Sequence, residues 1–272
     1  MPICAALCID EASALSDGLQ SMKQVVYFFG GNGHCRARLI PARITIERLS
    51  QANEVKSFEI VEAPYPGFEG RPKAAGFDAF LDAIVPSSRV DLIYGSGIGG
   101  LLALVLAVFN KLPHVPILLQ APVLWGLEKR WMPKLMRLMP HGMFDRITRT
   151  RLFQKRFART RFLRPLDDAT LRDFFDGFQQ CRAGGDFFDW LTPALLRQLE
   201  NGLRSDDRCL ERLQFWWGDL DRVVTIQELQ WTEAALKRSF PVRRFPEWGH
   251  YPMIDDPENW IRNLNHVLAT TS

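Results

Sequence analysis

Residues 90–109, with the sequence VDLIYGSGIGGLLALVLAVF, contain the local pattern that decides the fold. The mostly apolar run at 90–94 predicts a buried strand, and the longer apolar run at 98–109 predicts a buried helix. Four glycines at 95–100 link the two runs and permit a turn too tight for larger side chains. We therefore predict a strand, a sharp turn and a helix in direct succession.

The same alternation of strands and helices extends over most of the chain. Short apolar or aromatic runs predict five further strands, at Val25–Phe29, Phe58–Val61, Val115–Leu119, Leu213–Trp217 and Val242–Phe245. Helical spacing predicts further helices at Phe77–Ile84, Ile226–Arg238 and Asn259–Leu268. The fold class is therefore α/β, with a mostly parallel central sheet and helices on both of its faces.

A stretch of about ninety residues, from Pro122 to Arg212, interrupts the alternation. It has helical spacing of Leu, Phe and Trp and no clear strand signal, and prolines 122, 140, 165 and 193 divide it into about four helices. We interpret residues 122–205 as a helical lid inserted into a core formed by residues 1–121 and 206–272.

Composition excludes several classes of protein. A chain of 272 residues with 47% hydrophobic content can bury a sizeable core. No apolar run approaches the roughly 20 residues of a membrane helix, and acidic residues directly follow the N-terminal run Ile3–Ile9, so we expect no transmembrane segment, no secretory signal and a cytoplasmic location. A net charge of +3 does not suggest nucleic acid.

Cysteine usage argues against a metal or disulfide framework. The five cysteines form an odd set without CxxC spacing, so we predict neither a zinc site nor a disulfide scaffold and expect no cofactor.

The register of the glycine-rich turn decides which residue occupies its tip. In a G-x-S-x-G nucleophile elbow, small residues must stand two positions before and two after the tip. Ser96 has Tyr94 and Ile98 at those positions, whereas Gly97 has two glycines. We predict that Gly97 forms the tip and that the Ser96 hydroxyl points elsewhere.

Four other loops extend this pattern. They are FGGNG at 29–33, APYPGFEG at 63–70, WGDLDRVV at 217–224 and GHYPM at 249–253. With the turn at 95–100, they make the chain resemble the alpha/beta-hydrolase superfamily. The resemblance implies that Asp221 is the triad acid, that His250 is the base, and that an oxyanion site includes Gly31, Asn32 and Ile98, with amides at Asn32 and Ile98.

Two positions depart from the family pattern: Gly97 replaces the nucleophile, and Gly30 stands where the family commonly has histidine. We expect the Asp221–His250 dyad to act as a general base on a water molecule or on a substrate proton, giving hydrolysis or lyase- or cyclase-type chemistry. The expected substrate is a small apolar or aromatic carbonyl compound, such as an acyl ester or thioester. The neighbouring His34 could supply the polar group missing at Gly30.

Two alternatives stay open at this point. The chain could be a binding or scaffolding protein that has lost catalysis, or an ordinary esterase or thioesterase that uses Ser96 or Cys35 as its nucleophile. Trp125, near the start of the lid, and Trp248, close to His250, are expected to line the pocket of the predicted site.

Basic residues gather in the lid between Arg146 and Arg164, with interleaved Ile and Phe and no acidic residue. This pattern predicts an amphipathic helix whose basic face, including Arg149, Arg156 and Arg159, docks an anionic partner. An acyl carrier protein, a coenzyme A thioester or a membrane surface would fit. The alternative is a solvated face balanced by acidic residues of the next helix.

Overall fold

The computed structural model of the chain describes residues 23–31, 34–126, 138 and 142–271. The N-terminal run Ile3–Ile9, the oxyanion residue Asn32 and the proline at 140 lie outside these ranges. Among the described residues, no helix is long and apolar enough to cross a membrane.

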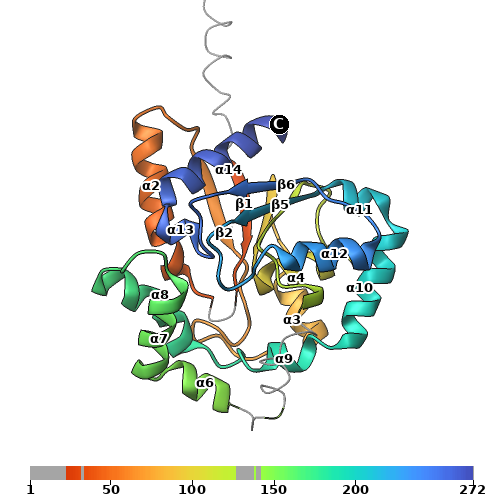
Figure 1. Cartoon of the computed structure of the whole chain (residues 1–272), viewed down its shortest axis with the longest axis horizontal. Helices are drawn as coiled ribbons and strands as arrows, with labels where there is room; N and C mark the ends of the chain where they lie inside the picture. The colour runs from red at the N-terminus through yellow and green to blue at the C-terminus, as the bar shows by residue number, and fades with distance from the viewer. Residues whose placement is uncertain (1–22, 32–33, 127–137, 139–141, 272) are drawn as a thin grey trace, which may run out of the picture.

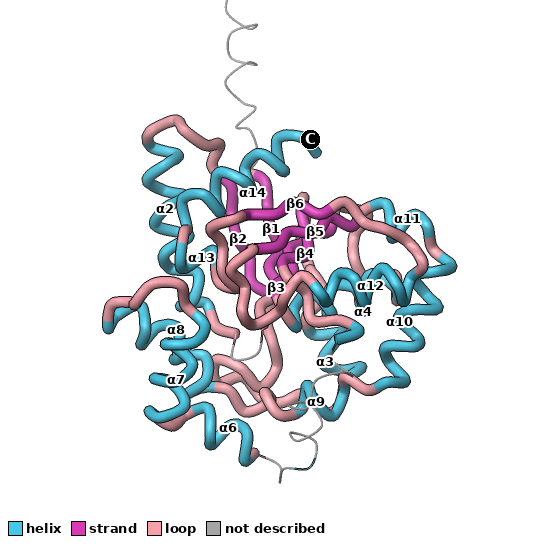
Figure 2. Tube along the Cα trace, viewed as in Figure 1, coloured by secondary structure: helices cyan, strands magenta, loops and turns pink. Residues whose placement is uncertain are grey.

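A six-stranded sheet forms the centre of the molecule, in the order β2-β1-β3-β4-β5-β6 (Figure 2). Its strands are β1 Gln24–Phe29, β2 Phe58–Glu62, β3 Leu92–Ser96, β4 Ile117–Gln120, β5 Leu213–Gly218 and β6 Val242–Phe245. Every neighbouring pair is parallel. All six predicted strands are thus present, and the sheet is fully rather than mostly parallel.

Helices cover both faces of the sheet (Figure 1). Successive residues of β1 alternate between two separate cores, Val26 and Phe28 in one and Tyr27 and Phe29 in the other. The first core is closed by α2 Ile40–Gln51, the short α13 Pro252–Asp255 and α14 Pro257–Thr271, and the second by α3 Phe77–Ala83, α4 Ile98–Val108 and α12 Gln227–Leu236. The sequence patterns located four of these helices, α3, α4, α12 and α14, but missed α2 and α13.

The insertion between β4 and β5 is helical, as predicted, and contains more helices than expected. The described ones are α6 Met143–Thr148, α7 Arg151–Arg161, α8 Asp168–Gln180, α9 Asp186–Trp190, α10 Pro193–Ser205 and α11 Asp207–Glu211. The first part packs near the short helix η1 Arg36–Leu39, which contacts α8. The last part packs on the core, because α10 lies against α4 and its leucines join the second core.

A close backbone approach fixes the turn between β3 and α4. A Cβ atom at position 99 would lie 2.1 Å from the carbonyl oxygen of Phe29, and one at position 95 would lie 2.7 Å from Cα of Gly100. The tip residue, Gly97, has φ 57° and ψ −119°, a conformation that L-residues rarely adopt. The geometry agrees with the predicted register, with Gly97 at the tip.

Candidate active site

The tip of the turn faces a histidine. A Cβ atom built on Gly97 would lie 3.4 Å from Nε2 and 3.7 Å from Cε1 of His250. The turn itself is held by backbone hydrogen bonds, since Gly97 N–H donates to the Gln120 carbonyl and Val123 N–H donates to the Gly97 carbonyl. The place where a nucleophile's side chain would begin is therefore in van der Waals contact with an imidazole nitrogen.

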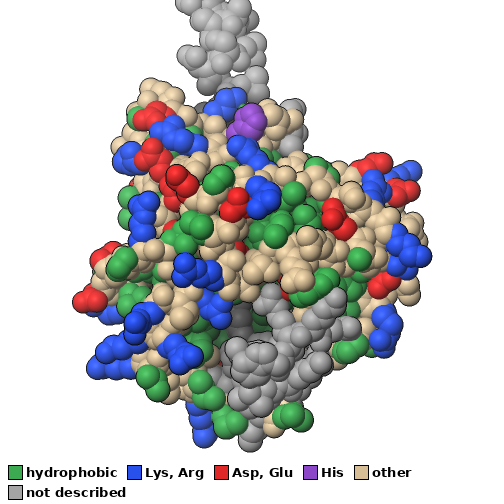
Figure 3. Space-filling model, viewed as in Figure 1, with side chains coloured by type: hydrophobic (Ala, Val, Ile, Leu, Met, Phe, Trp, Pro, Cys, Tyr) green, Lys and Arg blue, Asp and Glu red, His purple; other side chains and the backbone are tan. Residues whose placement is uncertain are grey.

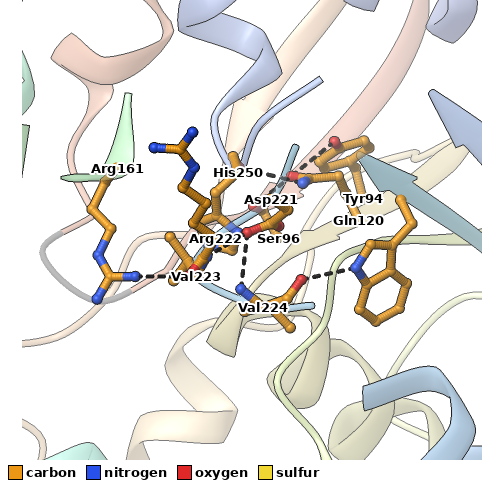
Figure 4. A network of polar contacts seen from close by, with 10 residues as sticks. Tyr94, Ser96, Gln120, Arg161, Asp221, Arg222, Val223, Val224 and His250 are labelled. Atoms are coloured by element: carbon orange, nitrogen blue, oxygen red, sulfur yellow. Dashed lines mark hydrogen bonds and ion pairs between the residues drawn. The ribbon is translucent and has the colours of Figure 1, made fainter. Parts of the chain in front are cut away.

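His250 and Asp221 form a buried pair (Figure 4). His250 Nδ1 lies 2.8 Å from Asp221 Oδ2, and the other carboxylate oxygen accepts the backbone N–H groups of Val223 and Val224 at 2.7 and 2.9 Å. A carboxylate partner places the proton of a neutral imidazole on Nδ1, which leaves the Nε2 lone pair facing Gly97. Both residues proposed from the sequence are brought together in the geometry of a general base and its orienting acid.

The loop that carries Asp221 is anchored by the core. The Trp217 indole, which is buried at the end of β5, donates its Nε1–H to the Val224 carbonyl at 2.8 Å. The N–H of the same Val224 donates to Asp221. The buried indole thus fixes the position of the backbone amides that bind the Asp221 carboxylate.

Gln120, the last residue of β4, links the turn to the histidine loop (Figure 4). Its Oε1 accepts the Ser96 hydroxyl at 2.8 Å, and its Nε2 donates to the His250 carbonyl at 3.3 Å. The Tyr94 hydroxyl lies at 3.5 Å from the same Oε1 and accepts the indole N–H of Trp260 at 2.9 Å. Sequence reasoning missed Gln120, although an amide at the end of an otherwise apolar strand was the available signal.

The Ser96 hydroxyl is therefore engaged with Gln120 and buried beneath the turn. This matches the expectation that Ser96 points away from the tip. Cys35 is also poorly suited to nucleophilic attack. Its thiol is buried, lies 3.6 Å from the Asp173 carbonyl oxygen, and has a pKa raised by that burial, which disfavours the thiolate.

His34 occupies the space that a side chain at position 30 would need. A Cβ atom on Gly30 would lie 2.0 Å from His34 Nδ1. The ring packs between Phe28 and Tyr65, with centroid distances of 5.9 and 4.9 Å. Burial, reinforced by Arg38 and other arginines, lowers the pKa of His34 to about 3, so the imidazole is neutral near pH 7.

The described part of the oxyanion loop lies against the turn. A Cβ atom on Gly31 would be 3.8 Å from the Ser96 carbonyl oxygen. Ile98 is the first residue of α4, where backbone N–H groups have no acceptor within the helix. A cavity of about 20 Å³, large enough for roughly one water molecule, is lined by Gly31, His34, Ser96 and Tyr251 among others.

The two tryptophans expected at the pocket have different surroundings. The expectation that Trp248 lines the pocket is wrong. Its side chain is 1% exposed and stacks on Phe245 with ring centroids 3.6 Å apart, so it lies in the core. Trp125 is half-buried and packs against the other core. Its buried Nε1 has no hydrogen-bond partner among the described residues.

The basic lid residues separate into two kinds. Arg149 is half-buried and donates to the carbonyls of Phe178 and Cys181, so it holds parts of the insertion together and is not available as a docking residue. Arg156 and Arg159 are exposed on α7.

Asp255 is a half-buried carboxyl group beside the histidine loop. Its Oδ1 accepts the Leu163 N–H at 3.4 Å, while Oδ2 has no hydrogen-bond partner among the described residues. Burial raises the pKa of Asp255 from 3.8 to about 6, despite the opposing effect of that N–H. The group joins the end of α7 to the loop of His250.

The chain belongs to the alpha/beta hydrolase family, whose model matches residues 38–262. Solved structures agree on the fold. A membrane phospholipase A is 19% identical with a TM-score of 0.59, covering 92% of this chain and 80% of that one. A haloalkane dehalogenase from Bradyrhizobium elkani is 15% identical with a TM-score of 0.64, covering 93% and 92%. The search of curated proteins gives no match.

Asp255 predicts a pH-dependent stability. The pKa of Asp255 in the folded protein lies above its value in the unfolded chain, so ionisation of this group destabilises the fold. The destabilisation is absent below about pH 4 and reaches its full size above about pH 6. We expect the unfolding free energy of Asp255→Asn, relative to the native protein, to rise by about 1–3 kcal/mol between pH 4 and pH 7. Urea unfolding across this range measures the difference.

Asp167→Asn is the matched control for that experiment. Its carboxylate caps α8, and hydrogen bonds from Thr170 lower its pKa, so the stability that this variant loses relative to the native protein should be almost fully lost already at about pH 4 and change little up to pH 7. Parallel pH profiles for Asp255→Asn and the native protein would contradict the assignment.

The contact between positions 30 and 34 predicts a coupled pair of substitutions. Gly30→Ala should destabilise the protein by about 1–3 kcal/mol, because the new methyl group overlaps the His34 ring. In a His34→Ala background the same change should cost little. Chemical denaturation of the four proteins of the cycle measures the coupling, and an equal cost in both backgrounds would show that the ring does not fill this space.

Proposed function

We propose that the protein is a hydrolase-fold enzyme that works without a covalent acyl-enzyme intermediate, using the Asp221–His250 dyad as a general base. One observation carries the proposal: the Cβ position of Gly97, where the family's nucleophile would start, is 3.4 Å from His250 Nε2. The base is built and oriented, and the residue it would normally activate has no side chain.

Water is the simplest replacement for the absent hydroxyl. Replacing serine by glycine removes a CH2OH group, and the space is comparable to the ~30 Å³ that one water molecule occupies in the liquid. His250 Nε2 would accept a proton from this water as its oxygen attacks the substrate carbonyl carbon. The imidazolium, stabilised by Asp221, would then return the proton to the leaving alcohol or thiol as the C–O or C–S bond breaks.

Amides at the start of α4 are placed to stabilise the negative charge that develops on the carbonyl oxygen. The Ile98 N–H lies directly after the tip, and the Gly31 backbone faces the turn. Preorganised donors of this kind commonly supply the largest part of the rate enhancement. His34, neutral and set where the Gly30 side chain would be, is suited to donate or accept a hydrogen bond without adding charge.

The same base supports a second reaction type. His250 could remove a proton from the carbon next to the carbonyl group, and the oxyanion amides would then stabilise an enolate, leading to elimination, decarboxylation or cyclisation. We place hydrolysis first because glycine leaves room for water directly beside Nε2.

Aromatic side chains support a small apolar acyl or thioester substrate. Tyr251 packs edge-to-face on His250 with ring centroids 4.8 Å apart and itself contacts Phe157, Phe162 and Phe174 of the lid. Apolar surroundings of this kind favour substrates with little charge. The ordinary-esterase alternative is disfavoured by the buried, hydrogen-bonded Ser96 and by the raised pKa of Cys35.

Restoring the hydroxyl tests the geometry of the site. We expect no labelling of the native protein by a fluorophosphonate probe, and labelling of Gly97→Ser at position 97, because the new hydroxyl would lie beside His250 Nε2. Intact-mass spectrometry and peptide mapping measure the adduct. Gly97→Ser combined with His250→Ala should remain unlabelled, and labelling of the native protein would identify a different nucleophile and overturn the proposal.

Turnover tests whether the dyad is used. Hydrolysis of a panel of short p-nitrophenyl esters and acyl thioesters should fall about 100-fold or more in His250→Ala, as expected for the loss of a general base. Cys35→Ala should keep the native rate, since the proposed chemistry does not use that thiol. If the native protein binds these compounds but His250→Ala changes neither binding nor rate, the protein is a binding protein and not an enzyme of this kind.

A further inference from the structure

Helix α7 presents a ridge of positive charge to solvent. Arg151, Lys155 and Arg159 are spaced four residues apart, so they lie along one side of the helix, and Arg156 lies next to them. All four are exposed, and no described residue forms an ion pair with any of them within 4 Å. We call these four residues and Leu152 the α7 ridge. Figure 3 shows Lys and Arg side chains gathered on this side of the molecule.

Leu152 stands within the ridge and is 80% exposed. At 100° per residue it lies between Arg159 and Arg156 around the helix. The apolar packing contacts of α7 are made on its opposite side, where Phe153 and Phe157 contact Phe178 of α8. A large aliphatic side chain surrounded by unpaired cations is therefore not required by the packing of the lid.

Acidic residues of the neighbouring helix do not neutralise the ridge. Asp168 lines a shallow hollow together with Arg151 and Lys155, but Arg172 lines the same hollow. The Asp167 carboxylate caps α8 by accepting the backbone N–H groups of Ala169 and Thr170, and Asp176 accepts a hydrogen bond from Gln180. The alternative of a solvated face balanced by acidic residues would need ion pairs between α7 and α8, and the described residues of these helices form none.

We propose that the α7 ridge binds an anionic lipid surface, with the helix lying in the plane of the headgroups. Lys and Arg would contact lipid phosphates, and Leu152 would enter the apolar boundary. The cations extend from Arg151 to Arg159, eight steps or about 12 Å along the helix, a spacing that suits phosphates spread in a plane. A lipid surface also accepts a single protruding leucine without a matching pocket, whereas an acidic protein would have to provide one.

The ridge lies across α7 from the dyad. Phe157, on the packed side, contacts Tyr251, which packs on His250. A lipid surface on the ridge would therefore be about one helix diameter, roughly 10 Å, from the His250 loop. Binding of lipid does not depend on catalysis, so the inference stands or falls separately from the proposed function.

Vesicle sedimentation tests the ridge. The full chain is mixed at low ionic strength with vesicles of phosphatidylcholine alone or of phosphatidylcholine with 30% phosphatidylserine. We expect binding only to the anionic vesicles, reversed by 0.5 M NaCl because that salt screens exposed charges. The variant Arg151→Gln, Lys155→Gln, Arg159→Gln should bind on the order of 100-fold more weakly, and Leu152→Ser should weaken binding with the charge unchanged.

A matched control removes three cations from another part of the surface. Arg197→Gln, Arg208→Gln and Lys237→Gln change the net charge equally on exposed positions of α10, α11 and the end of α12, and should leave binding unchanged. If both triple variants weakened vesicle binding equally, the effect would depend only on net charge, and the proposal would be overturned. Absence of vesicle binding, with salt-sensitive affinity of the native protein for a holo acyl carrier protein, would assign the ridge to an acidic protein partner instead.

Discussion

The close contact between the first turn of α4 and the end of β1 is the constraint on which the site depends. With the Phe29 carbonyl oxygen 2.1 Å from where a Cβ of residue 99 would lie, only glycine permits the approach. At the tip of the same turn Gly97 has a positive φ, and a Cβ atom on it would face His250. The loop after β1 lies beside the same turn, so this one contact sets where the Gly31 backbone, predicted to belong to an oxyanion site, lies relative to the tip.

Hydrogen bonds below the turn fix the position of the histidine loop relative to the turn. Gln120 hydrogen-bonds both Ser96 and the His250 carbonyl, and these atoms are buried, where leaving a polar group unpaired costs about 1–3 kcal/mol. Ser96 is thus part of the support of the site. Its hydroxyl is fixed by its hydrogen bond to Gln120 of β4, which explains why a serine next to the tip does not face His250.

Much of this arrangement could be predicted from residue patterns, and the failures have physical causes. The six strands and the Gly97 register follow from local sterics and alternating burial, which act within a few residues. Helix α2 was missed because its exposed apolar residues, such as Ile44, blur the helical periodicity. Trp248 was misplaced because its partner Phe245 is on β6, and the face that a loop tryptophan turns to depends on such tertiary neighbours.

The two departures from the family pattern differ in kind once they are seen in three dimensions. At Gly30 a side chain is absent from one position but the volume is filled by the His34 imidazole, so the loop keeps a neutral polar group and its packing. At Gly97 the space beside Nε2 is bounded by the base itself. The left-handed φ of 57° at this position favours glycine and would strain any L-residue, although a methyl group would lie in van der Waals contact with His250. Glycine at the tip leaves space next to the His250 imidazole, while the Asp221 carboxylate that pairs with this imidazole is held by two backbone amides.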